Sequence, residues 1–313
     1  MAMIDTLIYR KRWEKPEWAS LRKKIYYGLN SGKFPKAPLT EEGLLDWRGL
    51  SFPEDGRFNK SIFKNIDLSH CQTNYSWFTS CRFENILCIG ADLNGFRDEK
   101  CYFNEVKFQN CSADAGLGIH VSEYHHVIFK EVDFRDCSFY APQFYDCQFI
   151  DCMFNKVFFK ASNFINTIFK GNLVECVFQG YYFLPEEEKK YGKAPRNQML
   201  NVDFSEAELH LVAFRNNCPL TSIILPQDGK HYYFKYSLAT ITKMKEIIQK
   251  EWNGEARKEG MLYCDWMLTD ANKQDDFVEN IEDIYWFTGK KIGDCIFQLL
   301  VKVNQEIVKE KSH

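Results

Sequence analysis

Phenylalanine recurs at every fifth residue in the middle of this chain, and no other feature constrains the fold as strongly. The unbroken column has nine members: Phe129, Phe134, Phe139, Phe144, Phe149, Phe154, Phe159, Phe164 and Phe169. On an α-helix, a step of five residues advances about 140° past a full turn, so these rings would spiral around the rod. On a β-strand, an odd period places successive rings on opposite faces. Only a backbone that turns at every repeat directs all nine rings toward one axis, so the period predicts a solenoid.

The residues around each ring follow a second regularity. Two positions before each ring stands a mostly small side chain: Val127, Val132, Cys137, Pro142, Cys147, Cys152, Val157, Ser162 and Thr167. The resulting unit (small, polar, Phe or Leu, polar, any) is seen in residues 132–136 and 91–95, and it resembles the pentapeptide-repeat proteins. That resemblance covers roughly Phe52 to Leu225 and implies a mainly β fold, a right-handed quadrilateral β-helix with four quintets per coil. This family is defined by its fold, so the motif says little about activity.

The pattern divides the chain into three parts. Residues 1–50 are predicted to be a helical N-terminal cap, residues 51–226 the β-helix with an inserted loop at 184–200, and residues 227–313 a helical C-terminal cap or small domain. Within the cap, Leu7 to Tyr9 suggest a short strand and residues 16–29 a helix. In the last part, helices are predicted for 237–252, 276–287 and 292–307, and residues 261–268 are read as a helix or a strand, with the helix favoured.

The five-residue register has two shifts before the inserted loop. One extra residue is needed near Gly116, and one residue fewer at Gly171, after which Leu173, Phe178 and Phe183 are the expected ring positions. Asp98 occupies a ring position, where an unpartnered carboxylate would be costly. Asp98 at this position therefore indicates a bulge in the coil, a slip of the register or a functional carboxylate. Three histidines, His120, His125 and His126, follow the first shift and are candidates for a metal or acid-base cluster, or for ordinary outward-facing polar residues.

The inserted loop is the best candidate for binding a partner. An insertion in a solenoid usually leaves the coil as a surface loop. The resemblance also implies a role for it, because projecting loops are important in the topoisomerase-protecting members of the family. The residues proposed for contact are Glu186, Glu187, Glu188, Lys189, Lys190, Tyr191 and Arg196. The alternative is a tolerated loop without a partner.

Cysteine usage and charge limit the remaining possibilities. Eight of the twelve cysteines fall at the small position of the repeat, where they are expected to be buried free thiols. A disulfide between Cys81 and Cys101 on neighbouring coils is the alternative, but a reducing compartment favours thiols. The first residues lack the layout of a signal peptide and no apolar run could span a bilayer, so a cytoplasmic protein without membrane contact is expected. A net charge of −3 gives no reason to expect direct nucleic-acid binding.

No catalytic motif was found, so we expect no enzyme, no cofactor and no metal. Three functional hypotheses remain. The first is an interaction scaffold that binds an unknown protein partner through a solenoid face or the 184–200 loop. The second, implied by the resemblance, is a DNA mimic that modulates or protects DNA gyrase or another type II topoisomerase. The third is a catalytic C-terminal helical domain carried by the solenoid. The resemblance also implies a homodimer through the C-terminal region.

Overall fold

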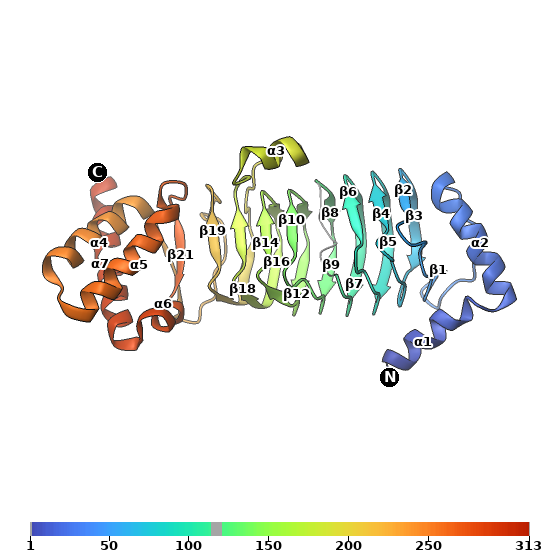
Figure 1. Cartoon of the computed structure of the whole chain (residues 1–313), viewed down its shortest axis with the longest axis horizontal. Helices are drawn as coiled ribbons and strands as arrows, with labels where there is room; N and C mark the ends of the chain where they lie inside the picture. Colours follow the sequence, from blue (N-terminus) through green and yellow to red (C-terminus); the bar gives the residue numbers. More distant parts are fainter. Residues whose placement is uncertain (1, 114–120, 313) are drawn as a thin grey trace.

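A computed structural model describes residues 2–113 and 121–312. The chain forms a straight rod of stacked coils with a group of helices at each end (Figure 1). The rod is a parallel β-solenoid of about six turns. All strand pairs inside it are parallel, as expected when each coil lies on the preceding one.

The strands of the rod fall into three sheets. The first face carries β2 (Arg57–Asn59), β4 (Trp77–Thr79) and β6 (Arg97–Glu99), and further along β10 (Ser138–Tyr140), β14 (Phe158–Lys160), β17 (Val177–Gln179) and β19 (Ala213–Arg215). The other strands form one twelve-stranded sheet: β1 (Leu45–Asp46), β3 (Ile62–Asp67), β5 (Arg82–Ile89), β7 (Tyr102–Gln109), β8 (Glu123–His125), β9 (Ile128–Lys130), β11 (Gln143–Tyr145), β12 (Gln148–Ile150), β13 (Phe154–Asn155), β15 (Asn163–Ile165), β16 (Ile168–Val174) and β18 (Asp203–His210).

The rings of the repeat stack along the inside of the rod. Phe63, Phe83, Phe103 and Tyr124 form one such column, with ring centroids 4.6 to 4.7 Å apart and nearly parallel planes. The nine predicted phenylalanines are all buried. Each contributes about 1.5 to 3 kcal/mol by leaving water, so the column is the main source of stability in the rod.

The chain turns at one residue in each quintet. This corner residue has a positive φ in coil after coil: Asn65, His70, Tyr75, Ser80, Asn85, Gly90, Gly95, Lys100, Glu105 and Asn110 in the first coils. The left-handed conformation reverses the local backbone direction without a longer loop, which explains how a five-residue period closes a four-sided coil. Asparagine tolerates this conformation well, and Asn85 also donates a 2.8 Å hydrogen bond to Asn65 on the coil before it.

Both predicted register shifts are confirmed by the pairing of neighbouring coils. Phe83 lies beside Phe103, a step of 20 residues, whereas Phe108 lies beside Phe129, which requires one extra residue. Phe154 lies beside Leu173, one residue fewer. The pairing resumes after the insertion, where Phe178 lies beside Phe214.

The predicted free thiols are confirmed: the twelve cysteines form no disulfide, and all but Cys295 are buried. The Sγ of Cys101 lies 3.2 Å from the carbonyl oxygen of Phe78 on the previous coil. Burial raises the pKa of Cys147, Cys152 and Cys176 to about 12, so these thiols are unreactive at neutral pH.

The N-terminal end of the rod is closed by two helices, α1 (Ala2–Arg12) and α2 (Pro16–Ser31). The predicted helix is confirmed, but the strand at Leu7 to Tyr9 is wrong. A helix places Thr6, Tyr9 and Arg10 on one side, where all three contact His70 of the first coil. A strand could not present residues with that spacing to one surface.

The C-terminal end carries α4 (Ser237–Glu251), α5 (Gly254–Ala271), α6 (Ile281–Thr288) and α7 (Lys290–Lys311). Three of the predicted helices are confirmed by α4, α5 and α7. The helix predicted for 276–287 is half wrong, because Phe277–Asn280 forms strand β21, antiparallel to β20 (His231–Phe234). The partner strand lies more than 40 residues earlier, and local periodicity does not register such a pairing. Asn280 then caps α6 by accepting a hydrogen bond from the Glu282 backbone N–H.

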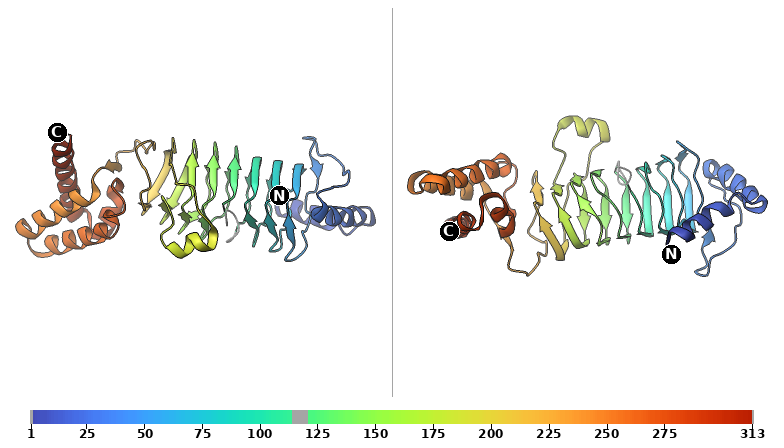
Figure 2. Two further views of the ribbon diagram at one scale, coloured as in Figure 1. Left: turned by 90° about the horizontal axis from the view of Figure 1, so that it is seen from above. Right: turned by 60° about the horizontal axis from the view of Figure 1, so that its bottom comes forward.

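The repeat ends earlier at the insertion than its period predicts. Phe183 was expected to point inward but is 49% exposed, whereas its neighbour Tyr182 is buried. The chain leaves the coil at Gly180, which lies against the Asn216 and Asn217 backbone so closely that a Cβ would be 2.2 Å from an oxygen. The predicted loop also contains a helix, α3 (Pro185–Tyr191), which stands away from the rod (Figures 1 and 2).

Candidate functional site

The first candidate site is the insertion that carries α3. Tyr191 packs on Tyr140 of β10 with ring centroids 4.1 Å apart, and the Lys160 ammonium lies 3.0 Å from the Glu187 carboxylate. Glu187 also accepts a hydrogen bond from the Leu184 backbone N–H and so caps its own helix. These contacts hold α3 in a fixed position over the first face.

The seven residues predicted for partner binding divide into two groups. Glu187 and Tyr191 are partly buried and anchor α3, whereas Glu186, Glu188, Lys189, Lys190 and Arg196 are exposed. Three apolar side chains at the base of the insertion are also exposed: Tyr181 (44%), Phe183 (49%) and Leu184 (49%). The sequence prediction missed this exposed group because the spacing of Phe183 fits the repeat, which places the start of the insertion after it.

The candidates on the irregular coil do not come together in a site. Asp98 is fully buried in the regular strand β6, so neither a bulge nor a register slip occurs there. Its carboxylate accepts a 2.7 Å hydrogen bond from the hydroxyl of Tyr124, which occupies a ring position in the next coil. The tyrosine at a phenylalanine position was the signal in the sequence that could have revealed this partner.

The two described histidines of this group, His125 and His126, have different surroundings. His125 stacks between Tyr102 and Tyr145 on the outside of the rod, with ring centroids 5.0 and 4.6 Å away. His126 is an exposed corner residue with positive φ. His120 lies outside the described residues. Within the ranges 2–113 and 121–312, no group of three or more His, Cys, Asp or Glu side chains could hold a metal ion.

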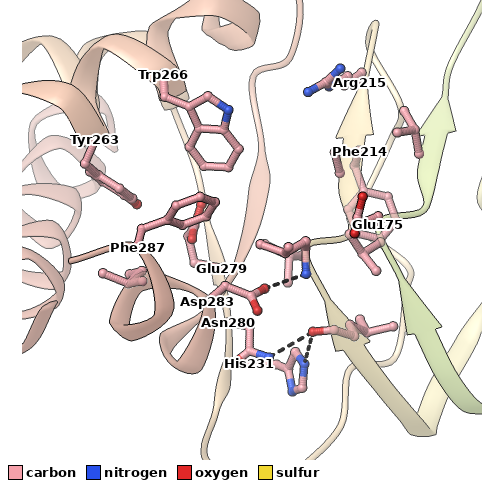
Figure 3. A pocket seen from close by; sticks show the side chains of 17 residues that line it. Glu175, Phe214, Arg215, His231, Tyr263, Trp266, Glu279, Asn280, Asp283 and Phe287 are labelled. Atoms are coloured by element: carbon pink, nitrogen blue, oxygen red, sulfur yellow. Dashed lines mark hydrogen bonds between the residues drawn. The ribbon is translucent and has the colours of Figure 1, made fainter. Parts of the chain in front are cut away.

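A second candidate site lies where the C-terminal helices meet the end of the rod. A cavity of about 130 Å³ opens between Phe214, Arg215 and Glu175 on the solenoid side and Trp266 and Phe287 on the helical side (Figure 3). We call it the junction cavity. Its presence was not predicted, because the sequence argument considered only the filled interior of the coils.

The buried polar groups of the junction cavity come from β21 and α5. Glu279 is 8% exposed, and no cation lies within ion-pair distance of it among the described side chains. Burial and, to a lesser degree, the Asp283 carboxylate raise the pKa of Glu279 to about 8. The nearby Tyr263 hydroxyl favours the ionised form of Glu279, but it is itself buried and makes no hydrogen bond of normal length in the described structure.

Three other charged or titratable groups around the junction cavity, Arg215, His231 and Asp283, already have partners. Arg215 Nε lies 2.8 Å from Asp270 Oδ2, and His231 Nδ1 lies 3.0 Å from Asp228 Oδ2. His231 Nε2 also contacts the Leu209 carbonyl at 3.1 Å, and the Asp283 carboxylate accepts a 2.7 Å hydrogen bond from the Leu211 backbone N–H. No serine, threonine or cysteine lies among the described residues that line the cavity.

None of the helices in the described ranges is both long and apolar enough to cross a bilayer.

Comparisons with known proteins find matches among solved structures. No protein-family model matches the chain, and no curated protein matches it. Among solved structures, it is similar to HetL, a pentapeptide repeat protein involved in heterocyst differentiation regulation from the cyanobacterium Nostoc sp. strain PCC 7120, at 10% identity and a TM-score of 0.26. That alignment covers 56% of this chain and 91% of HetL. It is also similar to QnrB1, a plasmid-mediated fluoroquinolone resistance protein, at 15% identity and a TM-score of 0.24, over 55% of this chain and 91% of QnrB1.

Identities and scores at this level assign no function to the chain. The architecture is established by its own coils, in which ring positions 20 residues apart pair from Phe63 to Phe83 to Phe103. This register makes the chain a parallel β-solenoid built from five-residue repeats.

Proposed function

We propose that the protein is a non-enzymatic interaction scaffold that binds a partner protein through the insertion at residues 181–196. The observation that carries this proposal is the exposure of Phe183, at a position where the repeat would bury a ring. Its neighbours in the sequence, Tyr181 and Leu184, are exposed as well, the Lys273 ammonium lies over the Phe183 ring, and the charged residues of α3 follow directly in the chain. An apolar cluster rimmed by charges is typical of protein interaction sites.

Rigidity supports the same proposal. The rod beneath α3 is filled with stacked rings, and α3 is attached to it by the Tyr140 and Lys160 contacts. A partner therefore meets a surface that is already ordered, which lowers the entropic cost of binding.

The test compares two variants in affinity capture from the native host. Replacement of Phe183 and Leu184 by alanine is expected to abolish retention of a partner that the original chain retains. The matched control is Ile62→Ala, which removes a similarly exposed apolar side chain (48%) from the rod. Loss of the same partner with the control, or its retention by the double variant, would contradict the proposed surface.

A DNA mimic acting on a topoisomerase is the second candidate. One side of the rod supports it: Asp92 and Asp133 lie on stacked coils, joined through Ser112, and Glu208 continues that side. The first face has the opposite charge, with Arg57, Arg97, Lys160 and Arg215 on its strands. A DNA gyrase supercoiling assay tests this candidate, and no change in supercoiling over a wide range of added protein would remove it.

A homodimer through the C-terminal region is supported by the exposed Trp286 (72%) and Leu262 (53%). Sedimentation analysis of the original chain and the Trp286→Ser variant tests it. A dimer lost in the variant supports this contact, whereas a monomer at all concentrations excludes it.

A further inference from the structure

The junction cavity combines features that a filled or merely structural gap would not require. It has about 130 Å³ of free space, enough for several water molecules or a small organic ion. Two polar side chains at its wall, Glu279 and Tyr263, are more than nine-tenths buried, and the Tyr263 hydroxyl lies near the Glu279 carboxylate without a hydrogen bond of normal length to any described residue. Buried polar groups are normally satisfied, so this hydroxyl points to a missing group in the cavity.

The charge of the lining favours a cation. Glu175, Glu279 and Asp283 contribute carboxylates, whereas the only cationic side chains among the described lining residues, Arg215 and His231, are each paired with an aspartate. An anion would have to displace Asp270 or Asp228. A cation near Glu279 would neutralise a carboxylate that has no ion pair with any described residue.

The aromatic side chains define the kind of cation. Trp266 and Phe287 lie above Glu279 on the helical side, with centroids 5.7 Å apart, and Phe214 faces them from the solenoid (Figure 3). Aromatic faces attract ammonium groups, whereas Ca²⁺ or Mg²⁺ needs several oxygen ligands. Trp266 and Phe287 are about half exposed, so the cavity can be entered from solvent.

We propose that the junction cavity binds a small organic ammonium ion, with Glu279 as counter-ion and Trp266, Phe287 and Phe214 as its aromatic walls. The Tyr263 hydroxyl supplies a hydrogen bond to Glu279 or to the ligand. This site is separate from the insertion at 181–196 and does not depend on the proposed scaffold function.

The direct test is calorimetric titration of the full chain with choline and with 3,3-dimethylbutan-1-ol, which has the same shape but no charge. We expect choline to bind at least about tenfold more tightly than the neutral alcohol, because only choline gains the cation–π and carboxylate contacts. Equal binding of both compounds, or no binding of choline at tens of millimolar, would overturn the proposal.

The pH dependence separates a counter-ion from a structural residue. Choline favours ionised Glu279, so its apparent affinity should rise about tenfold per pH unit as the pH approaches 8 from below, and then level off. The groups that face Glu279 are Asp283 from α6, Tyr263 from α5, Arg215 and Glu175 from the rod, and His231 from β20. Glu279→Gln is expected to bind choline at least about tenfold more weakly at pH 8.5 and to lose the pH dependence.

The matched control is Glu105→Gln, which neutralises an exposed carboxylate on the rod. It is expected to leave choline affinity and its pH profile unchanged. Circular dichroism establishes that each variant is folded. Wild-type affinity in Glu279→Gln, or an unchanged pH profile in that variant, would contradict the assignment of Glu279 as counter-ion.

Discussion

The two ends of the solenoid meet the same requirement in different ways. Each end exposes apolar side chains of a terminal coil and must be covered. At the N-terminal end, the cover is dense: Trp13 and Trp47 are buried, and Asp46 lies 2.6 Å from Arg12 and 2.8 Å from Arg48. At the C-terminal end, the helices cover the last coil but leave the junction cavity beside Phe214.

Comparison of the two caps separates residues that stabilise the end of the rod from residues that do not. The basic residues Arg10 and Arg12 both bind the first coil. At the other end, Glu279 is buried without an ion pair to any described residue, at a cost to stability. A cap selected only for stability would have an apolar side chain there.

The largest expected effect is at the closed end. Although burial raises it, the hydrogen bonds from Arg12 and Arg48 hold the pKa of Asp46 well below its usual value. Asp46→Asn leaves two arginines facing each other in a buried site, so we expect a loss of about 3 to 5 kcal/mol in the free energy of unfolding at pH 7, measured in urea. Because the folded pKa is lowered, this stabilisation is present above about pH 4 and lost in acid.

The chain contains a matched control for this variant. Asp133 and Arg135 repeat the Asp46 and Arg48 motif, with the same 2.9 Å contact from arginine Nε and the same 3.2 Å contact from the backbone N–H. Asp133 is half-buried and Arg135 is exposed, and no second arginine among the described residues pairs with Asp133 as Arg12 does with Asp46. Asp133→Asn should cost less than about 1 kcal/mol. An equal loss in the two variants would show that the closed end is not specially stabilised.

The second prediction concerns the open end. The folded pKa of Glu279 is raised to about 8, so the folded protein binds the proton more tightly than the unfolded chain does. The contribution of Glu279 to the free energy of unfolding is therefore full below about pH 4.5. It is lost as the pH rises toward 8, by at most about 1.4 kcal/mol per pH unit. Glu279→Gln should flatten this decline and be more stable than the original chain at pH 8.5. Urea unfolding from pH 5 to 9 measures it, and parallel curves for both proteins would contradict it.

Sequence periodicity predicted the body of the rod because the ring residue of each quintet marks the position of that quintet in the coil. Both register shifts follow from the spacing of rings such as Phe108 and Phe129. The C-terminal strands were not predictable in that way, since β21 pairs with β20 across an intervening pair of helices. Neither was the exposure of Phe183, because its spacing matches the repeat and only the close approach of Gly180 to Asn216 turns the chain outward.

The candidate sites show the same limit. The insertion was found in the sequence because it interrupts a period, and five of its seven candidate residues are exposed. The junction cavity was missed because its walls come from five separate segments, represented by Glu175, Phe214, His231, Trp266 and Glu279. Their proximity depends on how the helical end docks on the last coil, and no local pattern contains that information.

The smallest expected effect tests the body between the two ends. Glu105 is an exposed corner residue with φ of 55°, one coil beyond the ladder formed by Asn65 and Asn85. Glu105→Asn places a residue that tolerates the left-handed conformation at this corner and supplies a third amide to the ladder. We expect a gain of about 1 kcal/mol, seen as a rise in Tm, without any change in choline affinity at the open end. Glu105→Gln removes the same charge but neither favours this conformation nor fits the ladder, so its Tm should rise less. An equal rise in Tm in both variants would show that the gain comes from removing the charge and not from the corner conformation. The corners would then add nothing to the stability that the stacked rings give the body of the rod.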